Sequence, residues 1–134
     1  MILVDTSAIY ALADVADPNH AIAVERFSQL VQDRETLLLH NYIILEAAAL
    51  LQNRLGPASA MSFHRDARRF QIHWITSEDH RQAIGLWEER GMRQLSLVDC
   101  ASFIVMRRYV VTHVLAFDAD FQREGFILWT GATT

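Results

Sequence analysis

Short apolar runs separated by segments of helical periodicity constrain the fold of this chain more than any other feature. Residues 2–4 read Ile-Leu-Val and residues 37–39 are three leucines, which suits strands buried on both faces. Between these runs, apolar residues recur every three or four positions, as on one face of a helix. Strands that alternate with helices predict a parallel sheet covered by helices on both faces. We therefore expect an α/β fold.

The same alternation continues along the chain and sets the expected boundaries. Capping and breaking residues mark three of them: Asp17-Pro18 opens a helix, Gly56-Pro57 ends one, and Ser77 caps another. The predicted strands are residues 2–4, 37–39, 72–75, 114–117 and 126–129. The predicted helices are residues 5–13, 17–31, 41–54, 58–70, 77–91 and 98–109, with a short one around residue 121. We expect residues 1–134 to form a single domain.

The charged residues exclude several kinds of chemistry. All twelve basic residues are arginines, so a phosphate-binding loop of the G-x-x-x-x-G-K type, a Schiff-base enzyme and an aspartate site with a lysine partner are excluded. A formal net charge of −4 disfavours broad, sequence-independent adhesion to nucleic acid. No apolar stretch reaches the ~20 residues of a membrane helix, and residues 1–5 lack the basic start of a signal peptide. We therefore expect a cytoplasmic protein without a membrane partner.

Four acidic residues occupy positions that discourage charge. Asp5 and Asp118 directly follow predicted strands, while Glu46 and Asp99 lie near the starts of apolar helices. Because parallel strands end at the same edge of a sheet, all four side chains can reach one crevice. Carboxylate oxygens are the ligands that Mg²⁺ and Mn²⁺ prefer, and such ions activate water and stabilise charge on a phosphoryl group. A divalent metal site is therefore expected.

The aspartates also have structural explanations that are compatible with metal binding. Asp5 can cap the helix that follows it, and Ser96-x-x-Asp99 has the spacing of a capping box. Asp118 can cap the turn after it, and Asp120 competes with Asp118 for either role. For Glu46, the residues three and four positions away are all apolar or aromatic, so a solvated helix face is a poor explanation.

Together these residues resemble the PIN-domain ribonucleases, and among them the VapC-type toxins of toxin and antitoxin pairs. The resemblance rests on the order and spacing of four segments: Ile-Leu-Val-Asp-Thr-Ser at residues 2–7, Glu46, Ser-Leu-Val-Asp at 96–99, and Phe-Asp-Ala-Asp-Phe at 117–121 before Gly-Phe at 125–126. It covers nearly the whole chain. It implies a PIN-like three-layer sandwich over residues 1–134, with a central parallel sheet of about five strands flanked by helices.

The resemblance also implies a metal-dependent endoribonuclease that cleaves RNA by a metal-activated water. The expected catalytic ligands of one or two Mg²⁺ or Mn²⁺ ions are Asp5, Glu46, Asp99 and Asp118. Ser7 and Ser96 are expected to hold the acids and waters by hydrogen bonds. The family often has Thr two residues before the last acid, where this chain has Ala116, which leaves Asp120 as an alternative fourth acid.

The expected partners also follow from the resemblance: RNA, a second copy of the chain in a homodimer, and an antitoxin whose tail fills the acidic groove. Arg65, Arg68 and Arg69 share one predicted helix face and could contact RNA phosphates, although a solvated face is a simpler explanation. Two other hypotheses stay open. One is a catalytically silent PIN-like domain that binds a protein or RNA; the other is a phosphatase or DNA nuclease with the same metal chemistry.

Overall fold

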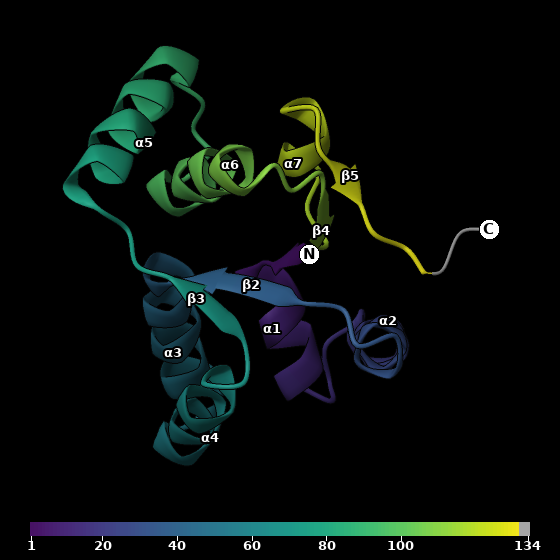
Figure 1. The fold of residues 1–134 in the computed structure, drawn as a ribbon. Helices are drawn as coiled ribbons and strands as arrows, with labels where there is room; N and C mark the ends of the chain where they lie inside the picture. The colour runs from purple at the N-terminus through teal and green to yellow at the C-terminus, as the bar shows by residue number, and fades with distance from the viewer. Residues whose placement is uncertain (132–134) are drawn as a thin grey trace.

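Five parallel strands form one sheet in the computed structural model, which describes residues 1–131 (Figure 1). The strands are β1 (Ile2–Val4), β2 (Leu37–His40), β3 (Gln71–His73), β4 (His113–Leu115) and β5 (Ile127–Leu128). Their order across the sheet is β3-β2-β1-β4-β5, so β1 is central. The predicted parallel α/β sheet is confirmed. The predicted domain runs to residue 134, and its last three residues lie outside the described residues.

Helices cover both faces of the sheet. Within residues 1–131 they are α1 (Thr6–Ala13), α2 (His20–Gln32), α3 (Asn41–Leu55), α4 (Pro57–Ala67), α5 (Ser77–Arg90), α6 (Leu97–Tyr109) and α7 (Asp120–Arg123). Figure 1 shows α1 to α4 in one layer and α5 to α7 in the other. Within the first layer, α3 contacts α4 and α1; within the second, α5 contacts α6. No helix in the described part of the chain has the length and apolar character needed to cross a membrane.

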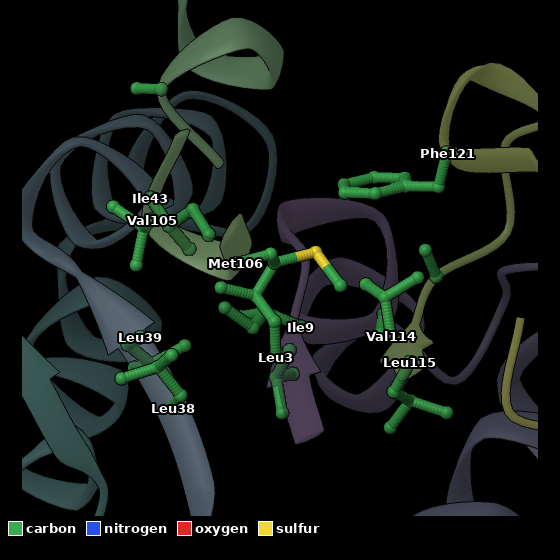
Figure 2. Packing of buried hydrophobic residues seen from close by; sticks show 14 of the residues in the cluster. Leu3, Ile9, Leu38, Leu39, Ile43, Val105, Met106, Val114, Leu115 and Phe121 are labelled. Atoms are coloured by element: carbon green, nitrogen blue, oxygen red, sulfur yellow. The ribbon is translucent and has the colours of Figure 1, made fainter. Parts of the chain in front are cut away.

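The central strands supply much of the hydrophobic core. Their fully buried side chains include Leu3, Leu38, Leu39, Val114 and Leu115. Figure 2 shows these beside buried residues of α1, α3, α6 and α7, namely Ile9, Ile43, Val105, Met106 and Phe121. Burial of one such side chain stabilises the fold by roughly 1.5–3 kcal/mol relative to exposure. Packing on both faces therefore holds the strand ends, and the residues that follow them, in fixed positions.

Two helices have a boundary that differs by three residues from the sequence prediction. Helix α2 begins at His20, because Asp17 Oδ1 accepts a hydrogen bond from Asn19 N (2.8 Å) in a turn that precedes the helix. Helix α4 ends at Ala67, and the next three residues form a turn that leads into β3. The prediction extended that helix to residue 70 because its polar residues kept helical spacing across the turn.

A buried polar network at the start of α5 corrects a third boundary and joins β3 to α6. Thr76, and not the predicted Ser77, caps α5: its hydroxyl accepts from Asp79 N and Asp79 Oδ2 accepts from Thr76 N, each at 3.0 Å. Asp79 also binds His73 Nε2 (2.7 Å) and forms an ion pair with Arg108. Although burial raises the pKa of Asp79, hydrogen bonds from these partners lower it to about 2. The Asp79 carboxylate thus anchors α5 in charged form.

Candidate active site

Two of the predicted acids follow the neighbouring strands β1 and β4. Asp5 comes directly after β1 and is 3% exposed, while Asp118 lies three residues after β4 and is half-buried. The strands are parallel, with Val4 opposite Leu115, and Asp5 N donates a hydrogen bond to Leu115 O (3.0 Å). Both acids therefore leave the sheet at its carboxyl edge, where open α/β sheets bind their ligands.

Ser7 connects these two strand ends. Asp5 caps α1, and its Oδ2 accepts hydrogen bonds from Ser7 N (3.2 Å) and Ser7 Oγ (2.7 Å). Ser7 Oγ in turn accepts a hydrogen bond from Phe117 N (3.0 Å), the residue before Asp118. The predicted cap and the predicted serine contact are thus both present. Ser7 fixes the orientation of the Asp5 carboxylate and the path of the backbone that leads to Asp118.

Asp99 belongs to a capping box at the start of α6, as its spacing predicted. Ser96 Oγ accepts a hydrogen bond from Asp99 N, and Asp99 Oδ2 accepts one from Ser96 N, both at 3.1 Å. Asp99 Oδ1 takes no part in the box. Capping therefore leaves one oxygen of this carboxylate available to other partners.

Asp120 differs from Asp118 in its surroundings. Its side chain is 9% exposed and forms an ion pair with Arg123. Its backbone N–H donates to Asp118 Oδ1 (2.9 Å), so Asp118 stabilises the turn that precedes α7. Helix α7 itself begins after Ala119, without a side-chain cap.

Mutual repulsion marks Asp5, Asp99, Asp118 and Asp120 as one group, which we call the acid cluster. Burial raises the pKa of Asp5 to about 7, the hydrogen bond from Ser7 opposes the rise, and repulsion from Asp118 and Asp99 adds to it. Burial likewise raises the pKa of Asp99 to about 6, and repulsion from Asp118 and Asp120 contributes. The pKa of Asp118 is also raised, chiefly by burial. A divalent cation would relieve both the burial cost and the repulsion.

Glu46 is not a member of the acid cluster. It is half-buried on α3, which packs against α1 and α6, the helices that begin next to Asp5 and Asp99. The repulsion felt by Asp5, Asp99 and Asp118 comes chiefly from one another and from Asp120. The structure therefore brings the aspartates together more closely than it brings Glu46 to them.

The donor chemistry of this site fits Mg²⁺ or Mn²⁺, because it consists of buried carboxylate oxygens on rigid elements. Among residues 1–131, however, no three His, Cys, Asp or Glu side chains converge closely enough to coordinate one ion. Binding of an ion thus requires the carboxylates to close around it.

Comparison with known proteins shows the family to which this chain belongs. The model of the PIN domain matches residues 2–127. This chain belongs to the PIN-domain family. It is 30% identical over 129 residues to the 23S rRNA-specific endonuclease VapC20 of Mycobacterium tuberculosis, covering 95% of this chain and 96% of the relative. Ribonuclease VapC26 of the same organism is 22% identical over 118 residues, covering 87% of this chain and 85% of that protein.

A solved structure gives the same result for the PIN fold. The crystal structure of M. tuberculosis VapC20, described as a sarcin-ricin loop cleaving toxin, matches this PIN domain with a TM-score of 0.83 and 29% identity. The match covers 95% of this chain and 97% of that one. The predicted VapC-type PIN fold is therefore confirmed.

The sequence did not indicate that one histidine is buried and joins α3 to α6 in this PIN domain. His40 Nδ1 accepts a hydrogen bond from Ile43 N (3.3 Å) and so caps α3, while Nε2 lies 2.8 Å from Ser102 Oγ. Because Ser102 Oγ donates to Val98 O (3.1 Å), the proton between the two side chains belongs to His40 Nε2. Burial lowers the pKa of His40 to about 3, so the ring is neutral. Its signal in the sequence was a polar residue at the end of an apolar strand, directly before a helix.

The three arginines predicted to contact RNA are not brought to the acid cluster. Helix α4 ends at Ala67, so Arg68 and Arg69 lie in the turn before β3, and the predicted shared helix face is wrong for them. Arg68 Nε donates to Arg65 O (3.4 Å). Since β3 is parallel to β2, its first residue lies at the amino edge of the sheet, opposite to the edge where Asp5 emerges.

Proposed function

We propose that this PIN domain is a metal-dependent endoribonuclease that hydrolyses RNA phosphodiester bonds as the toxin of a toxin and antitoxin pair. The observation that carries the proposal is the convergence of Asp5, Asp99 and Asp118 at the carboxyl edge of β1 and β4. Two relatives named as an endonuclease and a ribonuclease support the reaction class, and one is described as a toxin.

Mg²⁺ or Mn²⁺ is the proposed cofactor, with Asp5, Asp99 and Asp118 as ligands and Glu46 closing the site from α3. When bound, the ion would supply an activated water and neutralise the charge that builds on the scissile phosphate. Ser7 holds Asp5 through Oδ2 (2.7 Å), and Ser96 holds Asp99 through Oδ2 (3.1 Å). These contacts restrict the orientation of two carboxylates before they close around an ion, which lowers the cost of ordering them.

Asp118 is the better choice as the fourth acid, despite the preceding Ala116. Arg123 pairs with Asp120 and so already balances that charge, whereas the ion pairs of residues 1–131 include none with Asp118. A bound cation would therefore stabilise the charged carboxylate of Asp118 more than that of Asp120. Asp120 would act by holding Arg123 and by donating its N–H to Asp118 Oδ1.

The proposed partners are RNA, a cognate antitoxin and a second copy of the chain, acting in the cytoplasm. A basic antitoxin side chain would neutralise the acid cluster for the same reason that a cation would. Light scattering of the purified chain, alone and with its coexpressed antitoxin, tests the homodimer and the complex.

One experiment tests the reaction. The purified chain, freed of any copurifying protein, is incubated with total RNA in Mg²⁺ or Mn²⁺, beside an EDTA control and the Asp99→Asn variant. Discrete fragments that disappear in both controls establish the ribonuclease, and mapping of their ends identifies the target. Absence of cleavage by a folded chain, as judged by circular dichroism, supports the silent binding domain instead. A parallel assay with DNA and a phosphomonoester separates the other hydrolases.

A further inference from the structure

Arg26, on α2, contacts the residue that precedes Asp118 of the acid cluster. Its guanidinium Cζ lies 5.6 Å from the centroid of the Phe117 ring, and Phe117 directly precedes Asp118. Stacking on an aromatic ring fixes the plane of a guanidinium without using its N–H donors. The hydrogen bonds and ion pairs that the structure forms among residues 1–131 include none from the Arg26 side chain. Its five donors are thus oriented and available.

Arg123 reaches the same segment from α7. It forms an ion pair with Asp120, yet its side chain is 52% exposed. It lies on α7, the helix that begins two residues after Asp118. The contact with Asp120 uses one N–H of the guanidinium, at Nη2, so the remaining donors are free to bind an anion.

The two arginines come from opposite layers of the molecule. Figure 1 shows α2 in the layer of α1, α3 and α4, and α7 in the layer of α5 and α6. The segment 117–120 runs between them at the carboxyl edge of β4. An extended polyanion that crosses this edge would therefore meet one planar donor group on each side of Asp118.

We propose that Arg26 and Arg123 form a phosphate clamp that binds the RNA backbone on either side of Asp118; this inference rests on the proposed ribonuclease function. A guanidinium fork matches two phosphate oxygens, which a lysine ammonium does not. The clamp supplies positive charge next to the acid cluster in a chain whose formal net charge is −4. It replaces Arg65, Arg68 and Arg69 as the expected contact with RNA.

Anisotropy of a fluorescein-labelled single-stranded RNA tests the clamp. The test compares Arg26→Ala, Arg123→Gln and the double variant in the Asp99→Asn background, across a series of salt concentrations in Mg²⁺. Gln can still donate a hydrogen bond to Asp120, so the turn before α7 is preserved. We expect each change to weaken binding by three- to tenfold. The slope of log K against log salt should fall by ~0.7 for each RNA phosphate that the variant no longer binds.

Matched variants separate a clamp from general loss of charge. Arg81→Ala removes an exposed arginine of α5 whose ion pair is with Glu78, and it should leave affinity and salt slope unchanged. Arg26→Lys should restore the salt slope but only part of the affinity. In the cleaving enzyme, the clamp variants should raise KM with little change in kcat.

Two outcomes overturn the clamp: affinity and salt slope unchanged in the double variant, or equal losses in Arg81→Ala. Neither depends on turnover. If the wild-type chain fails to cleave RNA, the proposed function fails, while the anisotropy series still decides whether Arg26 and Arg123 bind the RNA backbone.

Discussion

The hydroxyl of Ser7 accepts a hydrogen bond from the backbone N–H of Phe117, 110 residues further along the chain, at 3.0 Å. The same hydroxyl donates to Asp5 Oδ2 at 2.7 Å. One small side chain therefore sets the relative positions of the acids that follow β1 and β4. Several measurable properties depend on this and on neighbouring contacts.

Removal of the Ser7 hydroxyl should weaken the site more than the fold. Ser7→Ala deprives Asp5 of a donor and Phe117 N of an acceptor, at a cost of about 1–2 kcal/mol in the free energy of unfolding. Cleavage at fixed Mg²⁺ should fall roughly 10- to 100-fold, as for other residues that orient metal ligands. Urea unfolding and a Mg²⁺ titration of RNA cleavage measure the two effects. Ser7→Thr, which keeps the hydroxyl, is the control; an Ala variant with an unchanged Mg²⁺ requirement would contradict this role.

The metal-free protein should lose stability as pH rises. The pKa of Asp5 is raised from 3.8 to about 7, so between these values the folded state binds more protons than the unfolded state, and the free energy of unfolding falls with increasing pH. The shift corresponds to at most about 4 kcal/mol. Mn²⁺ should therefore raise the Tm more at pH 8 than at pH 5, as followed by calorimetry. In the metal-free Asp5→Asn variant, the free energy of unfolding should depend less on pH. An equal slope of this free energy against pH in the variant and the wild type would contradict the prediction.

His40 should make the fold sensitive to acid. Its pKa is lowered from 6.5 to about 3, so the unfolded state binds more protons between these values and stability falls as pH falls through that window. His40→Asn can still cap α3 but leaves Ser102 without its donor, which should cost about 1–3 kcal/mol at pH 7.5. Because the variant lacks the imidazole, the difference in the free energy of unfolding between wild type and variant should be smaller at pH 5.5. Urea unfolding at both pH values with EDTA gives the comparison; a constant gap would refute the prediction.

Asp118 and Asp120 should respond differently to the same change. Asp118→Asn should abolish Mn²⁺ binding in calorimetry and reduce cleavage by about 100-fold or more, because it removes a ligand. Asp120→Asn should retain Mn²⁺ binding and lower the Tm, because it removes the ion-pair partner of Arg123. The opposite ranking would assign Asp120 as the fourth acid.

The convergence of the aspartates was predictable because it follows from topology and local spacing. Parallel strands end at one edge, so strands predicted at residues 2–4 and 114–117 placed Asp5 and Asp118 together, although β4 ends two residues earlier, at Leu115. The Ser96 and Asp99 capping box needed only four residues of sequence, and it is confirmed. Whether these acids bind a metal stays a prediction.

Contacts between distant elements were not predictable from the sequence. His40 meets Ser102 62 residues away, and Arg26, in the middle of α2, meets Phe117. Thr76 caps α5 because its hydroxyl accepts from Asp79 N while the Asp79 carboxylate accepts from Thr76 N, although serine is by type the better cap. Helical spacing persisted through Arg68 and Arg69 although the chain had already turned toward β3.

The capping box at Asp99 has a consequence for how this protein could lose its activity over evolution. Oδ2 of this carboxylate accepts the hydrogen bond from Ser96 N, and an asparagine oxygen can accept the same bond. A single Asp-to-Asn change therefore removes a charge on which the proposed metal site depends and spares the start of α6, whereas a change to Ala loses both the charge and the cap. One substitution would therefore be enough to turn the toxin into a harmless binding protein. We expect asparagine at this position in proteins that have lost the activity in this way.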